Sequence, residues 1–163
     1  MRAEVGDRSA DQRLLVKPDG SNETTAYALS LSNGQPVFTV TGGVDGSETQ
    51  TVNHGAAIDN GLWRHVAASF DGGTGLLSLY VDGRLSGTTT LTSALNTSSD
   101  DLLLGANGFI GDLAETRLWS TARSAQEIQD SYELAASGSE SGLVALWRGV
   151  EDPDGGTVVH DLA

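Results

Sequence analysis

The sequence predicts an all-β protein, an antiparallel two-sheet β-sandwich of the jelly-roll type with one short helix near residues 124–136. Short segments with alternating apolar and polar residues recur along the chain, and turn signals separate them. The 21 glycines and the many Ser and Thr residues favour a turn-rich β protein over a helical one. A length of 163 residues, 38% of them hydrophobic, suits one compact domain, which we place at 1–163.

The clearest strand signal lies in residues 61–85. Two strands are predicted there, Trp63 to Phe70 and Leu76 to Val81, joined by the Gly-rich turn 71–75. Apolar residues alternate along both strands, at Val66, Ala68 and Phe70 in the first and at Leu77, Leu79 and Val81 in the second. This spacing of two indicates a sheet with one buried face, which a second sheet must cover.

The remaining strands are shorter and are bounded by turn residues. They are expected at 13–17, 27–31, 37–41, 49–52, 84–91, 102–104 and 143–147, with a short extended piece at 157–160. Asn33-Gly34 and Asp82-Gly83 have the composition of hairpin turns. The polar strand Thr49 to Val52 is expected at a sheet edge or on a solvated face.

One helix interrupts the strand pattern. Ser124 and Glu127 have the spacing of a capping box, and Ile128 and Tyr132 share one helix face. We expect the helix to end at Gly138 and to pack as a lid on the rim of the sandwich. Residues 137–142 are interpreted as a flexible connector.

Four segments together resemble the laminin-G-like (LamG) jelly rolls, which are relatives of the concanavalin-like lectins and glucanases. They are Trp63-Arg64-His65-Val66-Ala67, Leu79-Tyr80-Val81-Asp82-Gly83, Leu104-Gly105-Ala106 and the run from Gly111 to Ile128. They occur in the order of the family and place the main body of the domain at 13–136. At the position of the family's Asp-Glu pair this chain has Ala114-Glu115, so one acidic ligand or hydrogen-bond acceptor of the family is replaced.

The resemblance also predicts an unusual arrangement of the two ends. Residues 1–9 resemble the continuation of a strand that lies early in the family unit, so the opening strands are expected to be absent. Residues 143–163, from Leu143 onward, resemble the segment with which a LamG unit commonly opens. We hypothesise that this C-terminal strand fills, in cis or in a neighbouring molecule, the sheet edge left open.

Composition excludes several classes of partner. The formal net charge of −13 leaves too few clustered Lys and Arg residues for binding nucleic acid. The chain has no cysteine, so it forms neither a disulfide nor a Cys-ligated zinc site. No apolar run is long enough for membrane insertion, and the N-terminus does not have the apolar core of a signal peptide.

The sequence contains no recognisable catalytic motif, and we predict that the protein is not an enzyme. A glucanase needs two carboxylates placed across a cleft, and the strand motif that carries them in the related glucanases does not occur. His54, His65 and His160 form no metal-binding pair, and His65 is expected to hydrogen-bond a nearby loop. The three tryptophans, Trp63, Trp119 and Trp147, are expected mainly in the core, with sugar stacking as the alternative.

Calcium is the one cofactor that the sequence leaves open. Asp and Asn side chains with backbone carbonyls in β-loops supply the oxygen ligands that calcium prefers. The candidate ligands are Asp112, Asp161 and Asn107.

Together with the resemblance, these observations predict a non-catalytic recognition or attachment module in an extracellular or surface assembly. Its ligand would be a glycan or a protein. Binding is expected at rim loops, of which residues 53–60, 93–101 and 107–108 are the candidates. The alternative is a structural domain without a ligand of its own, which docks to neighbouring subunits through its sheet edges in a fibre, shell or repeat array.

Overall fold

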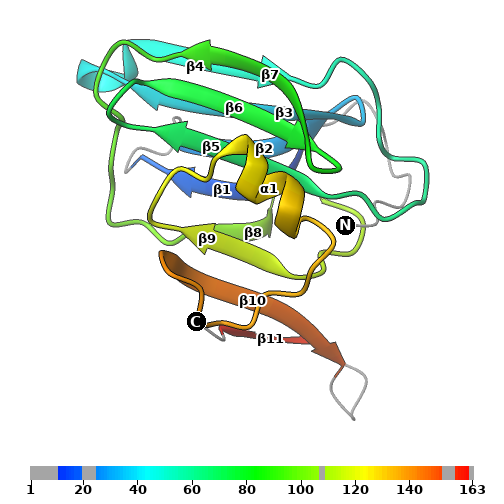
Figure 1. Ribbon diagram of the computed structural model, residues 1–163. Coiled ribbons are helices and arrows are strands. Elements are labelled where there is room, and N and C mark those ends of the chain that lie inside the picture. The colour runs from blue at the N-terminus through cyan, green and yellow to red at the C-terminus, as the bar shows by residue number, and fades with distance from the viewer. Residues whose placement is uncertain (1–10, 20–24, 107–108, 152–156, 162–163) are drawn as a thin grey trace.

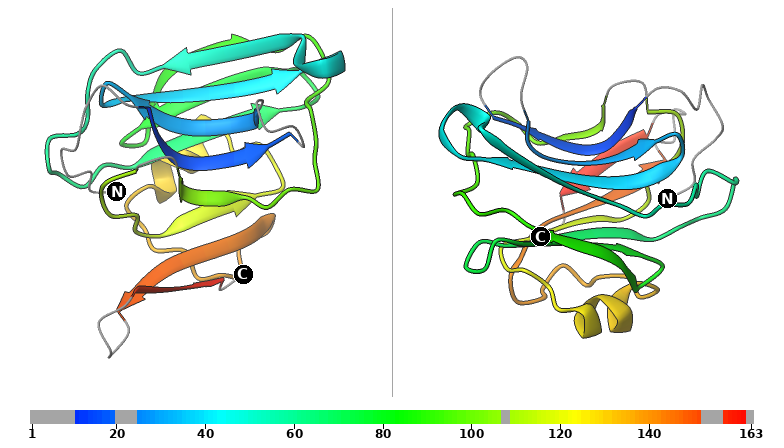
Figure 2. Two further views of the ribbon diagram at one scale, coloured as in Figure 1. Left: turned by 180° about the vertical axis from the view of Figure 1, so that it is seen from behind. Right: turned by 90° about the horizontal axis from the view of Figure 1, so that it is seen from above.

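The computed structural model describes residues 11–19, 25–106, 109–151 and 157–161. Two layers of antiparallel strands face each other, and a single short helix lies on the outer side of one of them (Figure 1; Figure 2, right). The predicted fold class, a mostly β jelly-roll sandwich with one short helix, is confirmed. Residues 1–9, which carry part of the sequence resemblance, lie outside the described residues.

One layer is a continuous sheet of five strands. These are β1 (Gln12–Pro18), β2 (Thr25–Ser32), β3 (Gln35–Gly42), β4 (Glu48–Asn53) and β8 (Leu103–Ala106). Their order across the sheet is β4-β3-β2-β1-β8. The polar strand β4 lies at an edge, as its composition predicted, and its Thr51 hydroxyl pairs with that of Thr39 on β3 at 3.2 Å.

The hairpin between β2 and β3 turns at Asn33-Gly34, as expected. Both residues have positive φ, 50° and 76°, which is the conformation that this residue pair adopts in tight hairpins. A Cβ atom on Gly34 would lie 2.5 Å from the Asp59 carboxylate, so the turn also lies against the segment that follows β4.

The facing layer consists of two separate three-stranded sheets. The first contains β5 (Val66–Asp71), β6 (Leu76–Val81) and β7 (Arg84–Thr90), in the order β5-β6-β7. The second contains β9 (Thr116–Trp119), β10 (Leu143–Glu151) and β11 (Thr157–Asp161), in the order β11-β10-β9. In the described part of the chain no strand pairing joins β5 to β9, so the layer is interrupted between them.

The core fills the space between the five-stranded sheet and the β5-β6-β7 sheet. One buried cluster contains Phe38, Val40, Val52, Leu77, Leu79 and Leu91, and a second contains Leu14, Leu31, Ile58 and Val81. On β6 the residues between these inward-facing positions, Ser78 and Tyr80, are buried as well. The expectation of one buried face is therefore wrong for β6.

The helix α1 (Ala125–Ser131) and the residues after it lie on the outer side of the β5-β6-β7 sheet (Figure 2, right). The capping box is confirmed, because the Ser124 side chain accepts from the Glu127 N–H while the Glu127 carboxylate accepts from the Ser124 N–H. The helix ends earlier than Gly138. Its last residue is Ser131. The carbonyl oxygens of Ser131 and Leu134 accept hydrogen bonds from Arg117 on β9 instead of from backbone N–H groups of a longer helix.

The C-terminal strand β10 pairs in cis with the outer edge of β9. Trp147 lies opposite Thr116 and Leu143 opposite Trp119. The connector at 137–142 is a hydrogen-bonded turn, since the Glu140 carboxylate accepts from the N–H groups of Ser137 and Gly138. β10 uses the outer edge of β9, and the inner edge that faces β5 makes no strand pairing within the residues that the structure describes.

Candidate functional site

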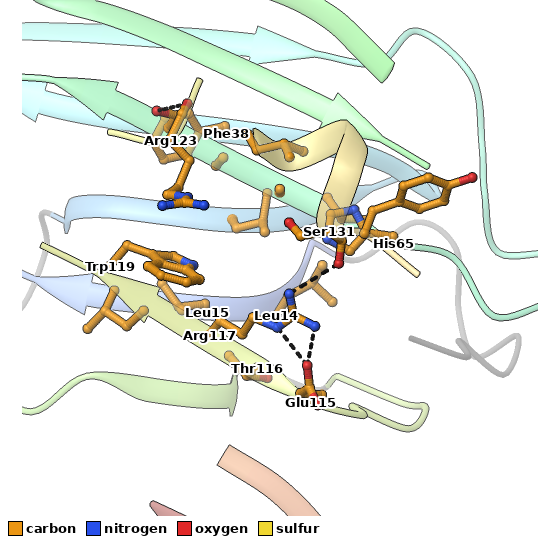
Figure 3. A pocket seen from close by; sticks show the side chains of 18 of the residues that line it. Leu14, Leu15, Phe38, His65, Glu115, Thr116, Arg117, Trp119, Arg123 and Ser131 are labelled. Carbon is orange, nitrogen blue, oxygen red and sulfur yellow. Dashed lines mark hydrogen bonds and ion pairs between the residues drawn. The ribbon is translucent and has the colours of Figure 1, made fainter. Parts of the chain in front are cut away.

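A cavity with a volume of about 1040 Å³ lies between β5 and β9. We call it the edge cleft. Its two sides are β5 and β9, and its floor is the inner face of the five-stranded sheet, with Tyr27, Leu29, Phe38 and Val40. Its outer side is formed by α1 and the flanking segments, which contribute Arg123, Ile128, Ser131 and Tyr132 (Figure 3).

The backbone of β5 presents hydrogen-bonding groups to the edge cleft. The Asp82 N–H donates to the His65 carbonyl at 2.8 Å, so these two opposite residues form a hydrogen-bonded pair. Hydrogen-bonded and non-hydrogen-bonded pairs alternate along antiparallel strands. Ala67 and Ser69 therefore bond to β6, whereas Val66, Ala68 and Phe70 direct their N–H and C=O groups toward β9.

Trp119 and Arg123 form one end of the edge cleft (Figure 3). The Arg123 guanidinium carbon lies 4.4 Å from the centre of the Trp119 ring, a cation–π contact. Arg123 also forms an ion pair with Glu127 at 2.8 Å, four residues later on α1. Trp119 is partly exposed, so the prediction that it is a core residue is wrong.

Glu115 is the centre of a polar network at the other end of the edge cleft (Figure 3). Its carboxylate accepts from Arg117 Nε at 2.6 Å, from Arg148 Nε at 3.0 Å and from the Ala136 N–H at 3.0 Å. Burial alone would raise the pKa of Glu115, but the Ala136 hydrogen bond and the two arginines lower it below its usual value. Glu115 is therefore ionised near neutral pH and links β9, β10 and the segment after α1.

Asp82 holds the other side of the edge cleft together. It follows β6 in a turn with positive φ values, 48° at Asp82 and 72° at Gly83, which confirms the predicted hairpin. Its carboxylate accepts from Arg64 at 2.5 Å and from the His65 N–H at 3.1 Å.

The His65 ring contacts the Tyr132 ring edge-on, with 5.9 Å between their centroids. Burial and the nearby Arg117 lower the pKa of His65, against the opposing effect of Asp82. Its Nδ1 atom is buried and accepts or donates no hydrogen bond within the described residues, so the predicted bond from the ring to a nearby loop is not found there.

Trp63 lies at the mouth of the edge cleft and is 54% exposed, so its predicted place in the core is wrong. Leu62, the preceding residue, is 59% exposed. We call these two residues the rim patch. The loop that carries Trp63 is attached at both ends, by Arg64 to Asp82 and by His54 Nδ1 to the Ser86 hydroxyl at 2.9 Å.

The candidate binding loops lie at opposite ends of the sandwich. The loop 53–60 bonds to the β2–β3 hairpin, through the N–H of His54 to Pro36 and the N–H of Ile58 to Gly34. The loop 93–101 lies at the other end, where the Ser98 hydroxyl donates to the Pro18 carbonyl. These two loops therefore cannot form a single site, and residues 107–108 lie outside the described residues.

The structure does not test the calcium candidates as a site. Asp112 is exposed, Asp161 belongs to β11 and pairs through its backbone with Trp147, and Asn107 lies outside the described residues. No group of three or more His, Asp or Glu side chains that could hold a metal ion occurs in the described part of the chain. Calcium binding stays a prediction.

His160 has its backbone in β11, opposite Arg148. Among the described residues no helix has the length and apolar character needed to span a membrane.

The fold and sequence match a known group of proteins. A family model described as the concanavalin A-like lectin/glucanases superfamily matches residues 3–129. No curated protein matches the chain.

Among solved structures, the chain is similar to one provisionally described as a carbohydrate binding protein from Bacteroides ovatus ATCC 8483, with 17% identity and a TM-score of 0.63. The match covers 93% of this chain and 53% of that one, so the chain spans about half of its length. An S-layer domain-containing protein from Clostridium thermocellum ATCC 27405 is 26% identical over 77% of this chain and 64% of that one. Its TM-score of 0.29 is too low to support a structural argument.

Proposed function

Because the chain belongs to the concanavalin A-like lectin/glucanase superfamily, we propose that it is a non-catalytic recognition module. Its ligand is a glycan or protein, bound within a larger extracellular or surface assembly. The location in such an assembly is a prediction from the sequence resemblance alone.

The exposure of Trp63 is the observation that carries the proposal. Trp63 has more than half of its surface in solvent and follows the exposed Leu62, so the two residues present an apolar surface with a flat aromatic face. Such a face can stack on the apolar face of a sugar ring or on an aromatic side chain. The anchors at Arg64 and His54 fix the loop, so the entropy lost on binding is small.

The charges in the edge cleft support a module without hydrolytic activity. Glycoside hydrolysis needs a protonated carboxylic acid opposite a second carboxylate. Glu115 is held ionised by its hydrogen bonds, and Asp82 is paired with Arg64. Glu115 is therefore not suited to act as a general acid near neutral pH.

Calorimetric titration of the protein with a panel of glycans tests this proposal. We expect one glycan class to bind, and Trp63→Ala to weaken it about tenfold or more because the stacking face is lost. Val44→Ala is the matched control, since Val44 is 82% exposed but lies at the opposite end of the sandwich. Equal binding by Trp63→Ala and the unmodified protein would show that the rim patch does not bind the glycan. Turnover of a β-glucan would contradict the proposal of a non-catalytic module.

A second candidate function is assembly through sheet edges without a small ligand. The observation that favours it is the pair of strands, β5 and β9, whose facing edges make no strand pairing in the described part of the chain.

A further inference from the structure

Two strand edges that face each other across an apolar cavity restrict what can fill it. β5 and β9 are the end strands of their sheets, and the edge cleft separates them. An extended polypeptide placed between them could hydrogen-bond to both at once. The two three-stranded sheets would then become one continuous layer opposite the five-stranded sheet.

From Val66 to Phe70, β5 has no charged residue, no proline and no bulge. Exposed edges in natural proteins commonly carry charged residues, proline or a bulge, which prevent pairing with other strands. The outer edge strand β4 fits this rule with its polar sequence ETQTVN. β5 has the sequence VAASFD, and its pairing with β6 is regular from Val66 to Asp71. The β5 edge is therefore suited to pairing.

The walls of the edge cleft define the side chains of the occupant. One face of an inserted strand would lie on Leu29, Phe38 and Val40, which require apolar side chains. The other face would lie under α1, near Ser131 and Arg123, which accept small or polar side chains. A sugar inserted to this depth would bury hydroxyl groups against an apolar floor without hydrogen-bond partners, which is unfavourable.

We propose that the edge cleft is an acceptor site for an extended strand donated by a partner protein, with apolar side chains at alternate positions. β9 has four residues and β5 has six, so the donated segment spans four to six residues. This proposal deepens the second candidate function, on which it rests, by naming the partner of the sheet edges.

Charge favours a different protein over a second copy of this chain as the donor. The chain carries a net charge of −13, and two copies would repel each other at close approach. A neutral or basic donor has no such barrier, and it would be attracted over a distance at low salt.

Amide hydrogen exchange on the full chain is the first test, because it needs no ligand. Amides of Ala67 and Ser69 are bonded to β6 and exchange slowly, whereas those of Val66, Ala68 and Phe70 face the edge cleft and exchange at least tenfold faster. The probe is then a ten-residue peptide of alternating valine and threonine with lysine at both ends. Its binding should slow exchange at Val66, Ala68 and Phe70, and leave the exchange at Ala67 and Ser69 unchanged.

Two controls test the backbone pairing itself. The same peptide with N-methyl groups at alternate residues keeps its side chains but loses the backbone N–H groups that would bond to the strand edges. We expect it to bind at least tenfold more weakly. In the protein, Ala68→Pro removes the N–H that faces the edge cleft without removing a bond to β6, whereas Ala68→Val keeps it. We expect Ala68→Pro to abolish peptide binding and Ala68→Val to retain it.

Three results would overturn the proposal: slow exchange at Val66, Ala68 and Phe70 without peptide, equal binding of the methylated peptide, or a stable dimer of the free chain that protects these amides. The methylated peptide is used with the unmodified protein, so the test does not depend on the folding of Ala68→Pro. Glycan binding at Trp63 is measured separately, so failure of the strand site leaves the rim patch unaffected.

Discussion

The two layers of the sandwich differ in continuity. Five strands pair without interruption in one layer, whereas the opposite layer is divided between β5 and β9. The difference is visible in burial: Leu77 and Leu79 on β6 are fully buried, but every residue of β5 and β9 is only partly buried. A strand is covered by its lateral neighbours as well as by the facing sheet. Closure of the sheet, more than hydrophobicity, thus determines which apolar residues form the core.

The largest expected effect is a difference in stability loss between a core position on β6 and a position on β9 beside the edge cleft. Leu79→Ala should lower the free energy of unfolding by about 2–5 kcal/mol, because it leaves a cavity in a closed core. Leu118→Ala on β9 should cost about 1 kcal/mol, since Leu118 already borders the edge cleft. Urea unfolding of both variants measures the difference, and equal losses would mean that the edge cleft is closed in solution.

The Glu115 network fastens the second sheet to the segment after α1. Glu115→Ala leaves Arg117, Arg148 and the Ala136 N–H without their shared acceptor, and we expect a loss of about 1–2 kcal/mol after allowance for solvent screening. Thermal unfolding measures it. Asp101→Asn, at an exposed carboxylate, is the control and should have almost no effect. A similar melting temperature for both variants would show that the network contributes little.

The capping box tests how firmly α1 covers the edge cleft. Ser124→Ala removes the acceptor for the Glu127 N–H and should cost about 1 kcal/mol. Ser124→Asn keeps a capping oxygen and should be nearly neutral. Circular dichroism and chemical unfolding distinguish them. Equal stability of the two variants would indicate that packing alone positions the helix.

The smallest expected effect is on the pH dependence of stability and concerns Glu48 on β4. Glu48 on β4 accepts from the N–H groups of Thr92 and Ser93, and the Thr92 bond is the main cause that lowers the pKa of Glu48 to about 2. Because the folded-state pKa is lower than that of the unfolded chain, Glu48 stabilises the fold above about pH 4.5. The stabilisation is lost as the pH falls from about 4.5 to about 2.

Glu48→Gln should therefore unfold with a weaker dependence on pH in this acid range than the unmodified protein. Melting temperatures recorded from neutral to acid pH measure the dependence. Parallel curves for the two proteins would exclude Glu48 as a source of acid sensitivity.

The features that depend only on residues close together in the sequence could be predicted. The hairpin turns at Asn33-Gly34 and Asp82-Gly83 and the capping box at Ser124 all lie where local composition placed them. The end of α1 could not be found in this way. The arginine that binds the carbonyl oxygens of Ser131 and Leu134 belongs to a distant strand, β9.

The edge cleft and the exposure of Trp63 also depend on long-range pairing. The residues of β5 alternate in the same manner whether or not another strand lies beside them, so the sequence gives no sign of the gap. Trp63 is predicted in the core from its place in a strand of the family, but in the structure it precedes β5, which begins at Val66.

The pairing of β1 with β8 has a consequence for biosynthesis. Arg13 lies opposite Ala106, so the last position in the five-stranded sheet is filled by residues made long after β1. At a translation rate of roughly 5–20 residues per second, the free edge of β1 would wait on the order of several seconds on the ribosome for its partner. During that interval the nascent chain presents an incomplete sheet with one unpaired strand edge.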